Sequence, residues 1–144
     1  MKLSTNSRYG LRSLIDLAEQ DGGAPVTLNA IANRQAVSES YLEQAFSALK
    51  KAGLVRSTRG SSGGYTLTRS PEQIRVGDVL RVLEGDLNIM QGNVAADAVS
   101  LAIADLVWQA IDSRLQAVVD DTTLADLIRE HERMRGRAQE NDGV

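Results

Sequence analysis

A short predicted helix that leads directly into a glycine-rich hairpin constrains the fold of this chain most strongly. Ser38 can cap a helix whose apolar residues keep 3.6-residue spacing up to Gly53, where a helix-ending glycine is expected. Residues 55–59 and 65–68 have the composition of strands, and glycines and serines separate them. The pattern therefore predicts a helix followed by a two-stranded β-hairpin.

The residues before this unit predict two further helices. Apolar residues near helical spacing predict a helix over about residues 7–19, which the turn-forming run from Asp21 to Pro25 ends. Thr27 can cap a second helix that ends at about Arg34. Because a tight turn joins this helix to the one after Ser38, the pair predicts a helix-turn-helix. The expected fold class is mainly α with a small β-hairpin, in a winged helix-turn-helix.

Positive charge is concentrated around the predicted helix and hairpin. Residues 1–80 hold ten Lys and Arg against seven Asp and Glu, whereas residues 81–144 hold six against twelve. An ordinary solvated surface would mix acids with bases, but residues 44–71 contain no Asp or Glu. The cations of this acid-free stretch are Lys50, Lys51, Arg56, Arg59 and Arg69. Although the chain has a net charge of −3, this asymmetry favours a nucleic-acid partner for its N-terminal part.

The C-terminal part predicts a long helix with an apolar stripe. A short helix over about residues 76–84 comes first, and a loop at 85–97 separates it from the long helix at about 98–119. The stripe is formed by Val99, Ile103, Leu106, Val107, Ala110, Ile111, Leu115 and Val118. A stripe of six turns exceeds what this small domain can cover, so the sequence favours a homodimer over packing within one chain.

The chain is expected to end in a second helix and a polar tail. Thr123 and Asp126 resemble a capping box that opens this helix. The expected division is a DNA-binding domain at 1–84, the loop at 85–97, the dimerisation and C-terminal helices at 98–133, and a disordered tail at 134–144.

Several classes of function are disfavoured. Without cysteine, the chain has no disulfide and no thiolate for catalysis or metal binding. No apolar run approaches the roughly 20 residues that span a bilayer, and the N-terminus lacks the apolar core of a signal peptide, so we expect a cytoplasmic protein without a membrane partner. Glu39 and Glu43 lie one turn apart, but no nucleophile or orienting base accompanies them, so no enzyme is predicted. His131, among Arg and Glu residues, is expected to be an exposed polar residue rather than a metal ligand.

A set of motifs in a fixed order carries a resemblance to a known family. They are Met1-Lys2-Leu3-Ser4-Thr5, Arg8-Tyr9-Gly10-Leu11-Arg12, Ser40-Tyr41-Leu42-Glu43-Gln44, Gly53-Leu54-Val55, Arg59-Gly60, Gly63-Gly64-Tyr65, residues 79–84, Trp108 and residues 122–127. With these motifs the chain resembles the Rrf2 family of bacterial winged-helix transcription regulators. The resemblance implies a homodimer built by the long helix, whose recognition helices and wings read a partly palindromic operator in duplex DNA. No enzyme activity is implied, and the regulator is expected to be a repressor.

Candidate DNA-contacting residues lie in three groups. In the helix at 38–52, the major-groove candidates are Ser38, Ser40, Tyr41, Glu43 and Gln44. At the wing, the minor-groove candidates are Arg59, Gly60, Ser61 and Ser62. The phosphate candidates are Thr5, Arg8, Lys50, Lys51 and Arg56. Glu43 can accept a hydrogen bond from cytosine N4, while Gln44 can pair with adenine or contact a phosphate.

The family also implies a cofactor that this sequence does not support. Members usually bind an iron–sulfur cluster through three cysteines, whose positions, counted back from Trp108, fall at Met90, Ala96 and Ala102; a ligand position of one branch falls at Asp105. Because Met, Ala and Asp cannot replace soft thiolates, no cofactor and no metal are predicted. Met90 fits natural loss of the cysteines better than engineered removal.

The sensing partner stays open at this point. A cysteine-free branch of the family, the CymR type, represses cysteine-metabolism genes and senses through a partner enzyme, cysteine synthase. The present chain is similar to that branch in having no cysteine. The alternatives are a small-molecule effector in a pocket around residues 90–104, and a winged helix that serves as a protein-interaction module without an operator.

Overall fold

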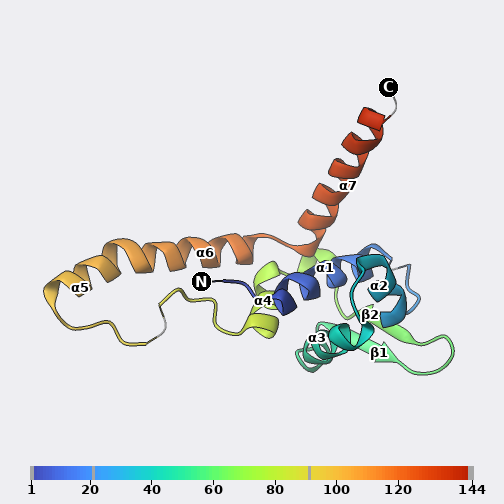
Figure 1. Cartoon of the computed structure of the whole chain (residues 1–144), viewed down its shortest axis with the longest axis horizontal. Helices are drawn as coiled ribbons and strands as arrows, with labels where there is room; N and C mark the ends of the chain where they lie inside the picture. The colour runs from blue at the N-terminus through green and yellow to red at the C-terminus, as the bar shows by residue number, and fades with distance from the viewer. Residues whose placement is uncertain (1, 21, 91, 143–144) are drawn as a thin grey trace.

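The computed structural model describes residues 2–20, 22–90 and 92–142. Figure 1 shows a body of helices with a hairpin, from which two helical arms extend. In chain order the elements are α1 (Thr5–Glu19), α2 (Leu28–Gln35), α3 (Glu39–Lys51), β1 (Val55–Thr58), β2 (Gly64–Leu67), η1 (Pro71–Gln73), α4 (Val76–Glu84), α5 (Ala98–Ile103), η2 (Ala104–Trp108), α6 (Gln109–Asp121) and α7 (Leu124–Asp142). Predictions that concern Met1, Asp21, Gln91 and residues 143–144 lie outside the described residues.

Side-chain caps define where the first three helices begin. Ser4 Oγ accepts from the Ser7 amide at 3.1 Å, Thr27 Oγ1 from the Ala30 amide at 3.1 Å, and Ser38 Oγ from the Tyr41 amide at 3.3 Å. The caps at Thr27 and Ser38 are those predicted. The first helix begins at Thr5, two residues before the prediction, because the Ser4 hydroxyl accepts from the Ser7 amide in its first turn.

The turn between α2 and α3 is tight. Ala36 has φ 56° and ψ 43°, a left-handed conformation that a non-glycine residue rarely adopts, and its amide donates to the carbonyl of Ala32. The Val37 amide also donates to that carbonyl, at 3.1 Å. Only three residues therefore separate the two helices, as in a helix-turn-helix.

The hairpin is bound to the chain segment before α2. In its antiparallel register Val55 faces Leu67 and Thr58 faces Gly64. Two backbone hydrogen bonds join Val26 and Tyr65, with N···O distances of 2.9 and 2.7 Å. A Cβ on Gly64 would lie 2.5 Å from the Val26 carbonyl oxygen, so only glycine permits this approach of the two backbones.

The main core joins all elements of the winged helix. The apolar residues predicted for the third helix, Leu42, Ala45, Phe46 and Leu49, are buried. Phe46 has no exposed surface, and its ring contacts Tyr65 of β2 edge-on with a centroid separation of 5.1 Å. The same core includes residues of α1, α2, α4 and the first residue of α7, so the body is one packed unit.

The long predicted helix is interrupted. Its C-terminal end is Asp121 rather than residue 119, and residues 104–108 form a π-helical turn in which the Gln109 amide donates to the Ala104 carbonyl. A constant 3.6-residue period hides such a turn, which inserts one extra residue and rotates the faces that follow. Leu115, predicted on the dimer stripe, is half-buried and packs within the protomer against the cluster formed by Val76, Leu80, Leu87 and Val119.

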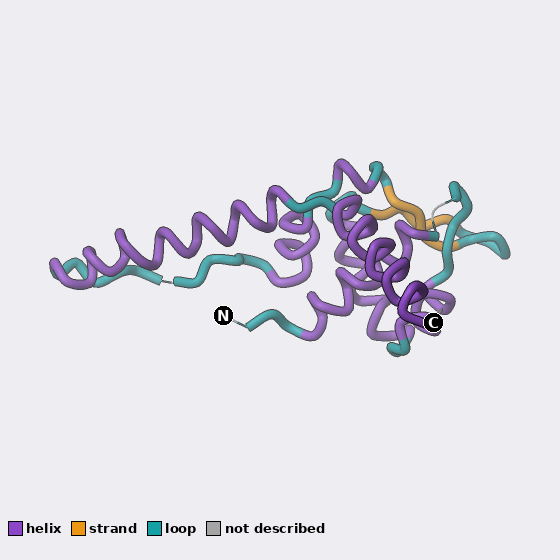
Figure 2. Tube along the Cα trace, turned by 90° about the horizontal axis from the view of Figure 1, so that it is seen from above, coloured by secondary structure: helices purple, strands orange, loops and turns teal. Residues whose placement is uncertain are grey.

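The α5–η2–α6 segment forms one continuous helical arm (Figure 2), and its base is fixed to α4. Arg81 of α4 donates two hydrogen bonds to the carboxylate of Asp120, at 2.7 and 2.9 Å, and a third to Gln116. The Ile89 amide donates to Asp112 Oδ1 at 2.7 Å, which holds the loop at 85–97 beside the arm. Within this loop the described residues form no helix or strand, as predicted.

The C-terminal helix begins as predicted and continues further. Thr123 and Asp126 form the capping box, with N···O distances of 2.9 and 3.1 Å. The prediction of a disordered tail from residue 134 is wrong for residues 134–142, which are helical. An Arg133–Glu130 ion pair within α7 and an Arg135–Glu19 ion pair with α1 support the polar C-terminal part of this helix.

The Arg81–Asp120 clamp predicts a defined pH dependence of stability. The hydrogen bond that Arg81 donates to the Asp120 carboxylate lowers the pKa of Asp120 below the ordinary value of 3.8. The clamp therefore stabilises the folded state fully above pH 3.8, and this contribution disappears as the pH falls through the lower folded-state pKa. We expect Asp120→Asn to lower the melting temperature at pH 7 and the difference from wild type to shrink in acid. The matched control is Asp121→Asn, an exposed carboxylate on the next residue. Equal effects of both variants at all pH values would contradict the clamp.

Candidate nucleic-acid interface

Helix α3 has a buried face and a solvent face. Ser40, Glu43 and Gln44, predicted to read bases, are exposed on the solvent face. Ser38 is exposed as well, although its hydroxyl serves as the helix cap. Tyr41 is half-buried because its ring lies edge-on to Tyr9, with centroids 6.1 Å apart. Four of the five predicted residues of this group therefore have exposed side chains, while Tyr41 also supports the packing of α3 on α1.

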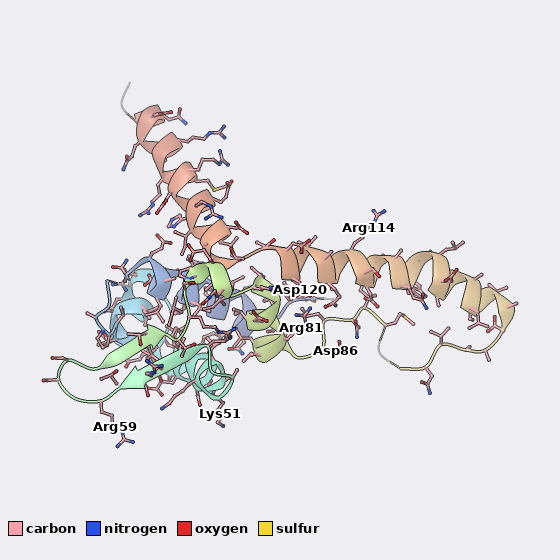
Figure 3. All side chains as sticks on the ribbon, turned by 180° about the vertical axis from the view of Figure 1, so that it is seen from behind. Lys51, Arg59, Arg81, Asp86, Arg114 and Asp120 are labelled. Atoms are coloured by element: carbon pink, nitrogen blue, oxygen red, sulfur yellow. The ribbon has the colours of Figure 1, made fainter. Side chains whose placement is uncertain are left out.

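The wing places a second exposed group beside α3. Arg56 on β1 and residues 59–62 at the tip are exposed, and the Gly63 amide donates to the Gly60 carbonyl at 3.0 Å to close the tip. Lys50 and Lys51 at the end of α3 are exposed as well. Figure 3 shows Lys51 and Arg59 projecting to the same side of the molecule, away from α6 and α7.

The third predicted group lies at the start of α1. Thr5 and Arg8 are exposed, and Arg8 Nη2 donates to Thr5 Oγ1 at 3.5 Å. This end of α1 is fixed to α4, because the Glu84 carboxylate accepts hydrogen bonds from the hydroxyls of Ser7 and Ser4 and from the Ser4 amide. These bonds, that of Ser7 foremost, lower the pKa of Glu84 and keep it ionised at neutral pH.

The cations of α3 and the wing form no ion pair with an acidic side chain in the described part of the chain. In residues 2–20, 22–90 and 92–142, the ion pairs involve Arg34, Arg81, Arg129, His131, Arg133 and Arg135. Lys50, Lys51, Arg56 and Arg59 are absent from that set. Their positive charge is therefore available to an external anion, and a phosphate backbone is the anion that such a spaced row of charges suits.

Two contacts near this surface could not be inferred from the sequence. Arg12 lies over the ring of Tyr9, 5.5 Å from its centroid, and its Nε donates to Gln35 Oε1 at 3.2 Å. Arg34 forms a salt bridge with the buried carboxylate of Asp16 at 2.7 Å. Both contacts join α1 to the helix-turn-helix. The pairs Arg12–Gln35 and Asp16–Arg34 are separated by 23 and 18 residues in the sequence, which leaves no local signal for them.

The positions at which the family resemblance implies cluster ligands do not fit an iron–sulfur cluster. Met90, Ala96, Ala102 and Asp105 are all exposed and supply no thiolate. Across the described part of the chain, no group of three or more His, Cys, Asp or Glu side chains is placed to hold a metal ion. Clusters of this kind need soft anionic sulfur ligands, which this donor set does not contain.

Comparison with known proteins places this geometry in a family. The Rrf2 family model, described as an iron-dependent transcriptional regulator, matches residues 3–130. The chain belongs to the Rrf2 family. Among Rrf2 relatives, the transcriptional regulator CymR of Bacillus subtilis is 45% identical over 127 residues, which cover 88% of this chain and 89% of CymR. The transcriptional regulator IscR of Vibrio atlanticus is 36% identical over 134 residues, covering 92% of this chain and 78% of IscR.

Solved Rrf2 structures share the fold. The structure of B. subtilis CymR, described as the global cysteine regulator, matches with a TM-score of 0.80 at 40% identity and covers 90% of this chain and 98% of its own. That of T. potens IscR matches with a TM-score of 0.76 at 41% identity, covering 93% and 90% respectively. The predicted winged helix with a long C-terminal helix is thereby confirmed. Within the described residues, no helix has the length and apolarity needed to cross a membrane.

The missing thiolates predict how this Rrf2 protein responds to iron and sulfide. After anaerobic reconstitution, iron analysis and visible absorbance should show no stoichiometric cluster, because the chain contains no cysteine. A matched control is the variant Met90→Cys/Ala96→Cys/Ala102→Cys, which restores three thiolates. A stoichiometric cluster in the unaltered protein would contradict the prediction.

Proposed function

We propose that this Rrf2 protein is a homodimeric repressor that binds a partly palindromic operator and functions without an iron–sulfur cluster. The observation that supports this most is the row of unpaired cations on α3 and the wing, next to the exposed polar residues of α3. In the proposed complex, α3 of each protomer enters a major groove, and the wing tip enters the adjacent minor groove. Glu43 and Gln44 of α3 contact bases in the major groove.

The phosphate contacts are assigned to residues around α3 and the wing. Lys50, Lys51 and Arg56 neutralise phosphates beside α3, and Thr5 and Arg8 reach the backbone from the start of α1. Arg59 and the small residues 60–62 follow the minor groove, where their low bulk allows close approach. Such phosphate contacts set affinity and orientation, whereas the bases contacted by α3 set specificity.

Exposed apolar side chains on the arm support the proposed dimer. Val99, Leu106 and Val118 are 69%, 76% and 64% exposed, and Ile103, Val107 and Ile111 are about 40% exposed. Ala110 is exposed beside them. Large apolar side chains exposed along an arm are unfavourable in water, so covering them by pairing with the arm of a second copy is favoured. Two arms joined in this way would hold two winged helices at a fixed distance on the DNA.

The relatives suggest which genes are controlled. B. subtilis CymR, described as the global cysteine regulator, shares 45% of aligned residues with this chain. We propose that this protein likewise controls genes of cysteine or sulfur metabolism. A partner enzyme such as cysteine synthase is one proposed sensor. Sequencing the genomic fragments bound by the purified protein tests the pathway, because the genes beside the bound sites name it.

The phosphate contacts predict the salt dependence of DNA binding. Lys50→Gln and Arg56→Gln should each reduce the slope of log K against log salt by about one, because each removes one released counterion. The loss should be similar for operator and non-operator DNA. Arg114→Gln is the control of equal charge, since Arg114 projects from α6 on the side away from Lys51 and Arg59 (Figure 3). Fluorescence anisotropy at several salt concentrations measures the slopes, and an unchanged slope in both variants would refute the assigned contacts.

The arm predicts a dimer that one substitution can break. Leu106→Asp should give monomers in sedimentation experiments, because dimerisation would bury an unpaired carboxylate. The fold should survive, since Leu106 is 76% exposed within the protomer. Arg114→Asp adds the same carboxylate to the arm at a position that already carries a charge, and it should leave the dimer intact. A dimer that persists in Leu106→Asp would exclude this face as the interface.

A further inference from the structure

A cavity of about 690 Å³ opens between α1, α2 and α7. Its lining residues come from α1, the end of α2 and α7, and α7 extends from the body on the side away from α3 and the hairpin (Figure 1). Small organic ligands occupy cavities of about 300–1,000 Å³, so its size suits a metabolite. Its lining includes neither the loop at 85–97 nor any residue assigned to DNA.

The carboxylates of the cavity wall already have partners. Asp16 accepts from Arg34 Nη2 at 2.7 Å and from Gln35 Nε2 at 2.8 Å. Glu19 lies 2.7 Å from His131 Nδ1 and 3.3 Å from Arg135 Nη2. Glu130, the third carboxylate, is paired with Arg133. A cationic ligand would have to displace these partners, so the wall disfavours cations.

Arg12, by contrast, provides a positive charge that can bind an anionic ligand. Its Nε donates to Gln35 at 3.2 Å, and its guanidinium lies over the Tyr9 ring, which together hold the group in place. Its two outer nitrogens have no hydrogen-bond partner among the residues that the structure describes. A guanidinium held in this way can bind a carboxylate through two parallel hydrogen bonds.

The rest of the wall offers an apolar surface. Ile15 and Leu127 are half-buried, and Met134 is 56% exposed. Methionine adapts its shape to a variety of apolar ligands. We propose that the cavity binds a small organic carboxylate with an apolar body, whose carboxylate pairs with Arg12 and whose body packs on Ile15, Leu127 and Met134.

The contacts of Arg12 connect this site to the helix-turn-helix. Tyr9, beneath Arg12, contacts Tyr41 of α3 edge-on, and Gln35 is the last residue of α2. A ligand that draws the guanidinium into the cavity therefore changes the support of both helices. The regulatory consequence rests on the proposed function: occupation of the cavity should alter operator affinity, within the roughly 5- to 150-fold range of allosteric coupling.

Octanoate is a suitable probe, and the methionine methyl groups report where it binds. The chain has three methionines, including Met134 in the cavity and Met90 in the loop. In the full-length protein labelled at the methionine methyl carbons, octanoate should shift the Met134 signal and leave that of Met90 unchanged. Met134→Leu and Met90→Leu assign the signals.

Variants and a neutral analogue test the carboxylate contact. Arg12→Gln should weaken octanoate binding roughly tenfold or more, as expected for the loss of charge-assisted hydrogen bonds. The control Arg114→Gln should bind octanoate as wild type does. Octanol, which has the same apolar chain without the charge, should bind more weakly than octanoate.

Three outcomes would overturn the proposal. The first is a Met134 signal that octanoate does not shift, and the second is equal affinity for octanol and octanoate. The third is a Met134 signal that shifts on protein dilution without octanoate, because this would mean that a second copy covers the cavity. Operator titration of the same samples separates the two proposals. Operator binding with an unresponsive Met134 refutes the cavity site alone, whereas a Met134 response without operator binding refutes the proposed function alone.

Discussion

The contact of Phe46 with Tyr65 is the point at which α3 and the wing are fixed to each other. Phe46 belongs to α3 and Tyr65 to β2, and their rings meet edge-on inside the core. Edge-to-face aromatic pairs of this kind add roughly 0.5–1.5 kcal/mol to the burial of their area. Tyr65 is also the residue whose backbone pairs with Val26, so one residue links the wing to the core and to the segment before α2. The spacing of helix and wing, on which any reading of a DNA groove depends, follows from these contacts.

A second constraint concerns how the winged helix is attached to the arm. The α4 helix lies between the other elements of the winged helix and α6, and its Arg81 donates hydrogen bonds to Asp120 and Gln116 of α6. At Gly77 a Cβ would lie 2.2 Å from Asp120 Oδ1, so the glycine allows the clamp to close. The first turn of α4 and the last turns of α6 are therefore in direct contact. Movement of the arm relative to the winged helix would require this contact to break.

Local features of the fold were predictable from the sequence, and contacts distant in the sequence were not. The caps at Thr27 and Ser38, the bounds of α4 and the capping box at Thr123 follow from residues a few positions apart, which is the range over which side chains satisfy helix ends. Residues separated by more than a helix, such as Tyr9 and Tyr41 or Asp16 and Arg34, meet only through tertiary packing. For the candidate interface, exposure of the cations was predictable from charge alone, whereas the partial burial of Tyr41 depended on such a distant contact.

The π-helical turn at Ala104–Trp108 has a consequence for how this architecture can diversify. One residue of an α-helix corresponds to a rotation of about 100° about the helix axis. Because the wide turn already accommodates one extra residue, deleting a single residue within it would restore a regular helix and leave the two parts of the arm in nearly the same relative orientation. The sequences of both parts would stay the same. Gain or loss of one residue at this turn thus offers an evolutionary route by which a lineage could change the length of the arm sequence while each arm face keeps its direction and the core stays unaltered, whereas the same change in a regular part of the helix would turn the distal faces by about 100°.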